Sequence, residues 1–445
     1  MLNDRVASVN GRLGAFAAGV ELDDLPEAVV ERAKDCLIHG LVVAHAGVGV
    51  GFAEMAGEAL GAASGEAHVL ASGAMAPAPL AAFANGALLH ARAQEDTHGT
   101  FHPGVTTIPA ALAAAEAGAA DGRTLLEAVV AGYEVGTAVS ALVTERSTPP
   151  FRATGVYGPL AAAAAAGRVQ RLDERRMGDA LAFAAAFAGG TSEAFGAGTD
   201  EWHFQSGMAA AAGLLASGLA RAGAQGSPNA FEGRAGYLDC FARGSDGAET
   251  IGAGLGHRWG ILDVTFKPFP ICAFNQAPAL LAADLAREHP GDIRSLILRM
   301  NEREATYPGM PGAGPFEQVA QTLMSTRFCV AVALAEGHIT FADLQRYDDP
   351  LLLDLIGRIE VVPEPGRPPK TAAATLTLAD GRVVDRAIED SQPRLSWDGR
   401  AVRENARRLR PETRLSDAGL EALIAAVEAL DRGGSVAALV ETSGQ

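Results

Sequence analysis

Blocks of alanine that recur along the first 260 residues are the feature that most restricts the fold of this chain. They are Pro109–Ala120, Leu160–Ala166, Ala180–Phe187 and Met208–Ala222. Alanine has the highest helix propensity of all residues, and its small side chain allows helices to approach one another closely. The blocks therefore predict a closely packed helical body.

Two prolines mark expected helix starts, because proline suits the first turn of a helix. One start is expected at Thr107, ahead of Pro109, and another at Leu25, ahead of Pro26. From Leu22 to Val43, apolar residues recur at spacings of three and four, which is typical of an amphipathic helix.

The pattern changes near residue 260, where runs typical of β-strands begin. The expected strands are Leu296–Met300, Ile359–Val362 and the two arms of a hairpin, Ala374–Leu378 and Arg382–Ile388. The turn of this hairpin is an Asp-Gly pair, which suits tight turns. The expected helices are Gln276–Glu288 and Phe316–Leu334, with a further helix, Ala418–Leu430, near the end of the chain.

Together these patterns predict a mainly α protein with two domains. A large all-α helical domain is expected from both chain ends, residues 1–260 with 391–445. A smaller α+β lid domain is expected from residues 261–390. A chain of 445 residues, 48% of them hydrophobic, is long and apolar enough to fill two cores.

The formal net charge of −17 restricts the partners of the chain. A field of this sign repels nucleic-acid phosphates and anionic lipid, so neither nucleic acid nor a membrane is an expected partner. A small anionic substrate fits only where a few cationic groups gather locally. The sequence also suggests neither a signal peptide nor a transmembrane span, and its four scattered cysteines are typical of a reducing compartment. We therefore expect a cytoplasmic protein.

The densest polar cluster is residues 90–104, where histidines, carboxylates and an arginine interrupt an alanine-rich region. The proline after His102 disfavours a helical backbone there, so His98 and His102 do not suggest a zinc site, and no metal is expected. We expect a loop that presents Asp96, Thr97 and His102 to a pocket. The plain alternative is a solvated loop between two helices.

Three further segments hold candidate binding residues, each beside glycine or proline. Arg152 and Thr154 precede the longest alanine block, where a cation and helix-start N–H groups can receive a carboxylate. Lys267 lies among two phenylalanines and two prolines, where burial favours a neutral amine that can transfer protons. The remaining candidates for the pocket are Trp202, His203, Gln205 and Tyr307. The alternatives are a capped surface helix, a core tryptophan and a lysine that extends to solvent.

Several common catalytic motifs do not occur in the sequence, namely G-x-G-x-x-G, the P-loop, G-x-S-x-G and H-E-x-x-H. Nucleotide-binding, serine-hydrolase and zinc-protease functions therefore lack their usual support. Cys272 has no histidine close to it in the sequence, so we expect a buried thiol rather than a nucleophile.

Four segments, in this order, resemble the motifs of the MmgE/PrpD family, which includes 2-methylcitrate dehydratase, cis-aconitate decarboxylase and iminodisuccinate epimerase. They are the D-T-x(4)-H-P loop (Asp96 to Pro103), the T-G-x-x-G-P turn (Thr154 to Pro159), the G-T block (Gly198 to Gly207) and the K-P-x-P-x-C signature (Lys267 to Cys272). The resemblance implies a helical domain built from both chain ends, a smaller lid, an active site between them, a homodimer, and no cofactor or metal.

The resemblance also suggests which positions carry the chemistry. Those that match active-site groups of the family are Asp96, Thr97, His102 and Lys267. Other pocket positions depart from the family pattern: Ala93 replaces an acidic residue, Arg152 a histidine, Trp202 a lysine, Gln205 a histidine, and Asn275-Gln276 a Thr-His pair. These departures leave the substrate open.

The reactions of the family remove a proton or CO₂ from carbon next to a carboxylate, so they need donors aimed at that carboxylate. The candidates for this binding are Arg152 and the turn from Thr154 to Gly158. His102 is the expected general base, and Lys267 is expected to protonate the product or assist departure of hydroxide. The Asp-Thr pair of the loop would orient the base or bind the substrate.

Three functions remain open at this point. The first is a lyase that dehydrates or decarboxylates a small hydroxy- or unsaturated (poly)carboxylate. The second is an epimerase or isomerase of a small dicarboxylate, which needs two bases on opposite faces of the substrate. The third is a helical scaffold without activity, against which the presence of both His102 and Lys267 argues weakly.

Overall fold

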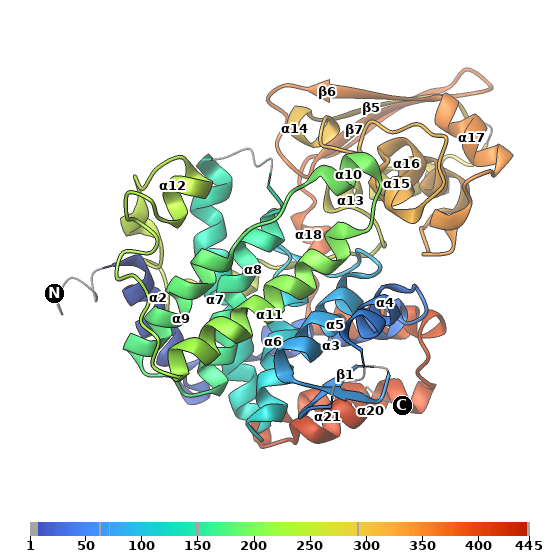
Figure 1. Ribbon diagram of the computed structural model, residues 1–445. Helices are drawn as coiled ribbons and strands as arrows, with labels where there is room; N and C mark the ends of the chain where they lie inside the picture. Colours follow the sequence, from blue (N-terminus) through green and yellow to red (C-terminus); the bar gives the residue numbers. More distant parts are fainter. Residues whose placement is uncertain (1–7, 62–63, 71, 147–150, 292, 443–445) are drawn as a thin grey trace.

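Helices form most of the chain in the computed structural model, which describes residues 8–61, 64–70, 72–146, 151–291 and 293–442 (Figure 1). The helices before residue 250 are α2 (Val9–Ala18), α3 (Glu27–Gly47), α4 (Phe52–Leu60), α5 (Ala78–His90), α6 (Gly104–Ala117), α7 (Gly122–Arg146), α8 (Ala153–Val169), α9 (Glu174–Phe187), α10 (Glu193–Ala197), α11 (Glu201–Arg221) and α12 (Tyr237–Ala242). The prediction of a mainly α protein is thus confirmed.

The alanine-rich helices pack at the centre of this body. Helix α8 is buried along its whole length, and it packs against α7 and α11. Helix α11 also packs against α5, where Gly86 faces Gly207 so closely that a Cβ on Gly86 would lie 2.7 Å from the Cα of Gly207. Small residues at these contacts allow the close approach that the sequence predicted.

The prediction of the α6 start at Thr107 is wrong. Helix α6 begins three residues earlier, at Gly104, and Pro109 lies inside it. The reason is a contact from outside the helix: the Asp96 carboxylate accepts the Gly104 N–H at 2.9 Å and so satisfies an N–H group at the helix start. The start expected at Leu25 is two residues early, because α3 begins at Glu27 and Pro26 is its N-cap residue.

The sequence predicted an all-α body, but the body also contains short strands. Two short antiparallel pairs interrupt it: β1 (Ala67–Val69) with β2 (Ala74–Ala76), and β3 (Asp96–Thr97) with β4 (Thr265–Phe266). The second pair joins residues about 170 positions apart, which no local pattern shows. It fixes the polar loop against the segment that contains Lys267.

The α+β part holds a four-stranded sheet of order β6-β5-β7-β8, in which β5 and β6 are parallel and the other neighbours are antiparallel. All four strands were predicted, and they are β5 (Ile293–Asn301), β6 (Ile359–Glu364), β7 (Ala372–Leu378) and β8 (Val383–Ile388). The helices are α13 (Gln276–Glu288), α14 (Glu302–Ala305), α15 (Val319–Met324), α16 (Thr326–Glu336) and α17 (Pro350–Gly357). The expected single helix Phe316–Leu334 is broken, because the Ser325 side chain accepts the Phe328 N–H and starts α16.

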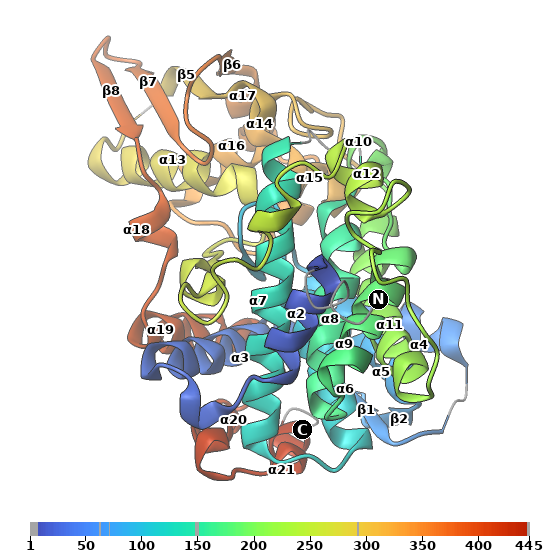
Figure 2. The same ribbon diagram turned by 90° about the vertical axis from the view of Figure 1, so that its left-hand side faces the viewer.

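The last helices are α18 (Gln392–Leu395), α19 (Gly399–Leu409), α20 (Asp417–Glu428) and α21 (Val436–Thr442). Helices α19 and α20 pack against α3, so helices from the first and last parts of the chain lie side by side (Figure 2). Buried apolar residues form two clusters. The first cluster contains residues from Val9 to Phe266 and from Val402 onward. The second contains residues from Phe269 to Leu395, together with four residues of the helical body. The boundaries 260/261 and 390/391 remain predictions.

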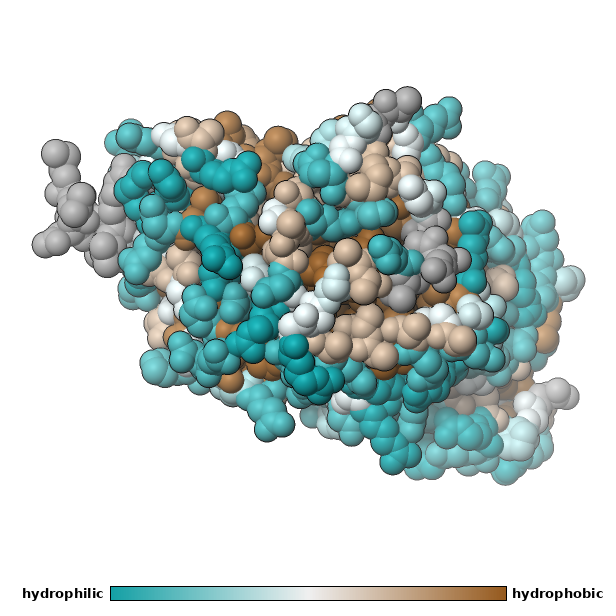
Figure 3. Space-filling view, turned by 90° about the horizontal axis from the view of Figure 1, so that it is seen from below, coloured by the Kyte–Doolittle hydropathy of each residue, from teal (hydrophilic) through white to brown (hydrophobic). Residues whose placement is uncertain are grey.

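One helix in the described part of the chain, α7 over Gly122–Thr144, is long and apolar enough to cross a membrane. Its apolar window is 89% buried inside the protein, as expected of a core helix. Helices α3 and α4 pass the same test only as a pair that is bent by 84°. When the molecule is viewed from below its orientation in Figure 1, hydrophilic residues cover much of the visible surface (Figure 3).

Candidate active site

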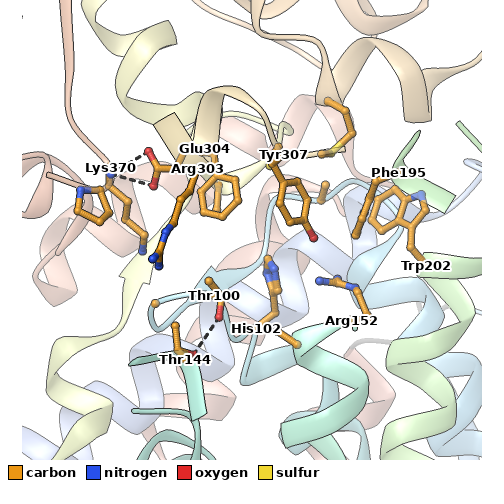
Figure 4. A pocket seen from close by; sticks show the side chains of 18 of the residues that line it. Thr100, His102, Thr144, Arg152, Phe195, Trp202, Arg303, Glu304, Tyr307 and Lys370 are labelled. Carbon is orange, nitrogen blue, oxygen red and sulfur yellow. Dashed lines mark hydrogen bonds between the residues drawn. The ribbon is translucent and has the colours of Figure 1, made fainter. Parts of the chain in front are cut away.

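A cavity of about 370 Å³ lies where the two apolar clusters meet (Figure 4). Its walls come from the polar loop, the start of α8, the start of α11, the segment after β4 and the α+β part. Of the predicted site residues, five line it: His102, Arg152, Trp202, Lys267 and Tyr307. The other five, Asp96, Thr97, Thr154, His203 and Gln205, do not line it.

The register of β3 and β4 decides which residues of the polar loop face Lys267. Asp96 pairs with Phe266 and Thr97 with Thr265. Because the strands are antiparallel, the residue before Asp96 lies opposite the residue after Phe266, which sets Glu95 opposite Lys267. The Lys267 ammonium donates hydrogen bonds to Glu95 Oε1 and to the Ala93 carbonyl. Lys267 is therefore not a lone amine in apolar surroundings, as the sequence suggested, but half of a buried ion pair.

Asp96 does not orient His102, which corrects the expected role of the Asp-Thr pair. Side chains alternate along a strand, so Asp96 points away from Glu95. Its carboxylate accepts the Tyr133 hydroxyl and the Gly104 N–H, and burial raises the pKa of Asp96 to about 6. A Cβ at Gly104 would lie 2.7 Å from this carboxylate and 2.9 Å from the Tyr133 hydroxyl, so a larger residue would displace them. Thr97 bonds instead to Thr265, with their hydroxyl oxygens 2.8 Å apart.

Glu95 is the carboxylate at the centre of the site. Its Oε1 lies 2.7 Å from His102 Nδ1, and its Oε2 lies 3.1 Å from His90 Nδ1. The side chain is 2% exposed. Burial alone would raise the pKa of Glu95, but the Lys267 ammonium and the two imidazoles hold it well below its usual range. Glu95 therefore provides a fixed negative charge.

His102 is held as a neutral imidazole. Burial and the nearby Lys267 ammonium lower the pKa of His102 well below its usual value, although Glu95 acts in the opposite direction. With Glu95 at Nδ1, the tautomer that carries its proton on Nδ1 is favoured, and Nε2 keeps a free lone pair. A neutral imidazole on the cavity wall can accept a proton at neutral pH.

Arg152 is a buried cation to which the described part of the chain supplies no carboxylate partner. It is 5% exposed, and among the described residues no carboxylate oxygen lies within 4.0 Å of its guanidinium. The guanidinium contacts His90 Nε2 at 2.8 Å and lies 5.1 Å from the centre of the Phe195 ring. In Figure 4 the hydroxyl of Tyr307 points towards the space between Arg152 and His102. Such a cation suits an anionic ligand in the cavity.

Helix geometry explains why only one residue of the predicted group on α11 lines the cavity. Successive residues of a helix are rotated by about 100°. Trp202 faces the cavity, and its ring meets the His90 ring edge-on at 4.7 Å. His203 lies behind Trp202, between the rings of Trp202 and Phe52, with its ring centre 3.5 Å from each, and does not reach the cavity. Gln205 donates to the Thr191 carbonyl at 3.0 Å.

Thr154 lies inside the first turn of α8 and is fully buried. The residue that presents a polar group from this turn is Arg152, which precedes the helix with an extended backbone. Cys272, expected to be a buried thiol, is half-buried and lines the cavity. Burial raises the pKa of the Cys272 thiol, so it remains protonated and a poor nucleophile.

Sequence reasoning missed several residues of the site. His90 and Glu95 belong to the polar cluster that the sequence showed, but nothing in the pattern separates them from Asp96. Thr100, within the D-T-x(4)-H-P loop, was also missed. Other missed residues come from segments without a motif, namely Phe195, Phe274, Arg303, Glu304 and Lys370.

Two family models match this chain. The MmgE/PrpD N-terminal domain matches residues 11–249, and the MmgE/PrpD C-terminal domain matches residues 269–396. The chain belongs to the MmgE/PrpD family. The resemblance that the motifs suggested is thus confirmed.

Curated relatives of this family member are cis-aconitate decarboxylases. The protein of that name from Aspergillus terreus (strain NIH 2624 / FGSC A1156) is 26% identical over 371 residues, which cover 78% of this chain and 75% of the relative. The human protein is 26% identical over 397 residues, 82% of this chain and 79% of the relative. The mouse protein is 25% identical over 409 residues, 84% and 80%.

Apart from Gln205, whose amide bonds to the Thr191 carbonyl, the positions where this family member departs from the usual motifs fall into two groups. Ala93, Arg152 and Trp202 line the cavity. Asn275 and Gln276 do not, and their amide groups donate to backbone carbonyls of Met324 at 2.9 Å and of Phe269 at 3.0 Å. The first group thus changes the cavity wall, whereas the second serves the packing of the α+β part.

Proposed function

We propose that this protein is a lyase that breaks a bond next to a carboxylate of a small acid, by dehydration or decarboxylation. The observation that carries the proposal is the buried Arg152 guanidinium, which faces the same cavity as His102 and has no carboxylate partner among the described residues. Membership of the MmgE/PrpD family and the decarboxylase relatives support this class of reaction.

Each cavity residue has a separate task in the proposed reaction. Arg152 binds the carboxylate that accepts the developing negative charge, and its burial strengthens this electrostatic interaction. His102 accepts the proton from the neighbouring carbon at Nε2, while Glu95 at Nδ1 stabilises the imidazolium that forms. The Lys267 ammonium, with Glu95 as its counter-ion, donates a proton to the departing hydroxide or to the carbon that has lost CO₂.

The atoms balance for both reactions. In dehydration, His102 takes the proton from carbon, the electron pair forms a double bond, and the departing hydroxide takes a proton from Lys267 and leaves as water. In decarboxylation, the bond to a carboxylate carbon breaks and releases CO₂, and the electron pair left on carbon takes a proton from Lys267. Neither reaction needs an oxidant or a reductant.

A panel of small hydroxy acids and unsaturated acids in D₂O, followed by NMR, tests the proposal. Net loss of water or CO₂ from any acid would support it. Deuterium exchange with inversion of configuration, without loss of water or CO₂, would identify an epimerase instead. The absence of any change across the panel would leave a scaffold without activity.

Replacing Arg152 by alanine should weaken the binding of carboxylates, because a charged hydrogen bond worth ~1.5–3 kcal/mol is lost. Lys267→Ala should do the same. Isothermal titration with an acid that the panel identifies measures both effects, and Arg382→Ala, which removes an exposed cation from the β7–β8 turn, is the control. An unchanged dissociation constant in both cavity variants would place the carboxylate site elsewhere.

We also expect a homodimer that forms through the helical body. Met208, Leu215 and Leu219 recur on one side of α11 and are 59%, 53% and 41% exposed. Exposed apolar residues that share one face are typical of an interface. Light scattering at micromolar concentration should give twice the chain mass, and Leu215→Glu should reduce it. A wild-type mass near 45.6 kDa would contradict this prediction.

A further inference from the structure

Lysine is rare in this chain and concentrated at the cavity. Only three of the 36 lysine and arginine residues are lysines: Lys34, Lys267 and Lys370. Lys34 forms ion pairs with Glu31 and Asp431 at the base of the helical body. The other two line the cavity. Lys267 belongs to the proposed machinery, whereas Lys370 has no role in it so far.

The backbone of Lys370 is held in an unusual conformation. Its φ is +58°, in the left-handed region that residues with a Cβ seldom adopt. The Lys370 N–H donates to both carboxylate oxygens of Glu304, each at 3.0 Å, and this fixes the segment against α14. Residues with a strained backbone cluster at ligand-binding and active sites. Lys370 fits this pattern, because it lies on the cavity wall and its backbone is held by the buried Glu304 carboxylate.

The Lys370 ammonium has no carboxylate partner in the part of the chain that the structure describes. No carboxylate oxygen there lies within 4.0 Å of its Nζ, and the carboxylate of Glu304 is occupied by the backbone. The neighbouring Arg303 guanidinium likewise forms no ion pair with the described residues. In Figure 4, Lys370 and Arg303 lie towards one end of the cavity, Arg152 towards the other, and His102 between them.

Much of the remaining wall of the cavity is apolar. Phe274, Leu323 and Met324 line it, Phe195 and Trp202 lie at the Arg152 end in Figure 4, and the only carboxylate that the described residues place on the wall is that of Glu304. A ligand that satisfies this arrangement carries an anionic group at each end and a hydrocarbon segment between them. A ligand with one carboxylate would leave the Lys370 end unpartnered.

We propose that Lys370 is a specificity-determining residue that binds a second anionic group of the substrate, at the end of the cavity opposite Arg152. The proposal rests on the proposed function, because Arg152 and His102 set the position of the first carboxylate and of the reacting carbon. The substrate class is then an acid with two terminal anionic groups separated by an apolar segment.

The charge on Lys370 provides a second readout. Burial lowers the pKa of Lys370 to about 8, with Glu304 acting to raise it and Lys267 to lower it. The charged and titratable groups that face it are Glu304 and Arg303 of α14, Lys267, and His98 of the polar loop. Burial raises the pKa of Glu304 to about 7, so the two groups change charge within the same range. Above about pH 8 the lysine loses its charge, and the second anion loses its partner.

The test uses straight-chain dicarboxylates of increasing length, each paired with its monomethyl ester, and isothermal titration calorimetry. In the wild type, at least one diacid should bind more tightly than its half ester. In Lys370→Met this advantage should fall by about 10- to 100-fold, the loss of one charged hydrogen bond, while half-ester binding stays unchanged. Lys370→Arg should keep the advantage and retain it at pH 9, where the wild type loses it. Arg382→Met, a control for overall charge, should behave as the wild type.

Other outcomes overturn the proposal in distinguishable ways. If no diacid exceeds its half ester, or if Lys370→Met weakens both equally, Lys370 does not bind a second anion. If half esters still bind and lose affinity in Arg152→Ala, the proposed function stands without this extension. If neither diacids nor half esters bind the wild type, the carboxylate site itself is wrong and both proposals fail.

Discussion

Replacing His102 by alanine is expected to lower turnover by ~10²–10⁴-fold, the usual contribution of a positioned general base. The imidazole is buried on the cavity wall, Glu95 lies 2.7 Å from its Nδ1, and its lowered pKa keeps Nε2 unprotonated at neutral pH. Because the side chain belongs to a loop and not to an apolar cluster, folding should survive the change. Steady-state kinetics with the acid identified by the deuterium panel measure the effect.

His98→Ala is the matched control for this experiment. His98 lies four residues earlier in the same loop and does not line the cavity, so its removal should change turnover much less. If His98 proved essential and His102 dispensable, the assignment of the base would be wrong and the match of this loop to the family motif would need to be redrawn.

Replacing Glu95 by glutamine should be the most damaging change to stability in the site, at about 3–5 kcal/mol of unfolding free energy. Removing one partner of a buried ion pair leaves the other charge without compensation, and Lys267 is 3% exposed. Activity should fall as well, because both histidines and the lysine lose their shared carboxylate. Chemical denaturation measures the loss.

A second substitution separates the charge effect from a loss of packing. In the double variant Glu95→Gln with Lys267→Met, both buried charges are absent, so much of the lost stability should return. If the loss of unfolding free energy in the double variant equalled the sum of the losses in the two single variants, the two residues would not be coupled.

The same pair gives a pH dependence of defined sign. The pKa of Glu95 is depressed in the folded state, so its contribution is present above its unfolded value near 4.5 and is lost as pH falls through the folded value. The stability difference between wild type and Glu95→Gln should therefore shrink below about pH 4.5. His90 and His102 are buried as neutral groups and also make the folded protein less stable as the pH falls below about 6.5. The reason is that their unfolded forms take up protons that the folded forms do not.

Local sequence patterns were sufficient for the elements that depend on local physics. Alanine blocks predicted the helices, and β-rich runs around an Asp-Gly turn predicted β7 and β8. Residues beside prolines or glycines in polar or aromatic segments, such as His102, Arg152 and Lys267, were found because their chemistry is unusual in its surroundings. Helix ends were less predictable, since a contact from Asp96 moved the start of α6.

The choice between adjacent residues required the tertiary structure. Of the adjacent pair Glu95 and Asp96, the sequence prediction named only Asp96. The pairing of β3 with β4, about 170 residues apart, shows instead that Glu95 faces Lys267 while Asp96 faces Tyr133. Alternation along a strand decides this, but its phase is set by a partner that the local sequence does not reveal.

The sequence by itself thus determined the helical class, the four strands of the sheet, and the candidates His102, Arg152 and Lys267 that the cavity brings together. The tertiary structure decided which carboxylate lies beside His102 and which residue of α11 reaches the cavity. It also decided that Lys370, in a segment without a motif, stands at the far end of the cavity. The physical reason is that propensity and hydrophobic period act between near neighbours, whereas a site is assembled from side chains whose directions depend on long-range packing.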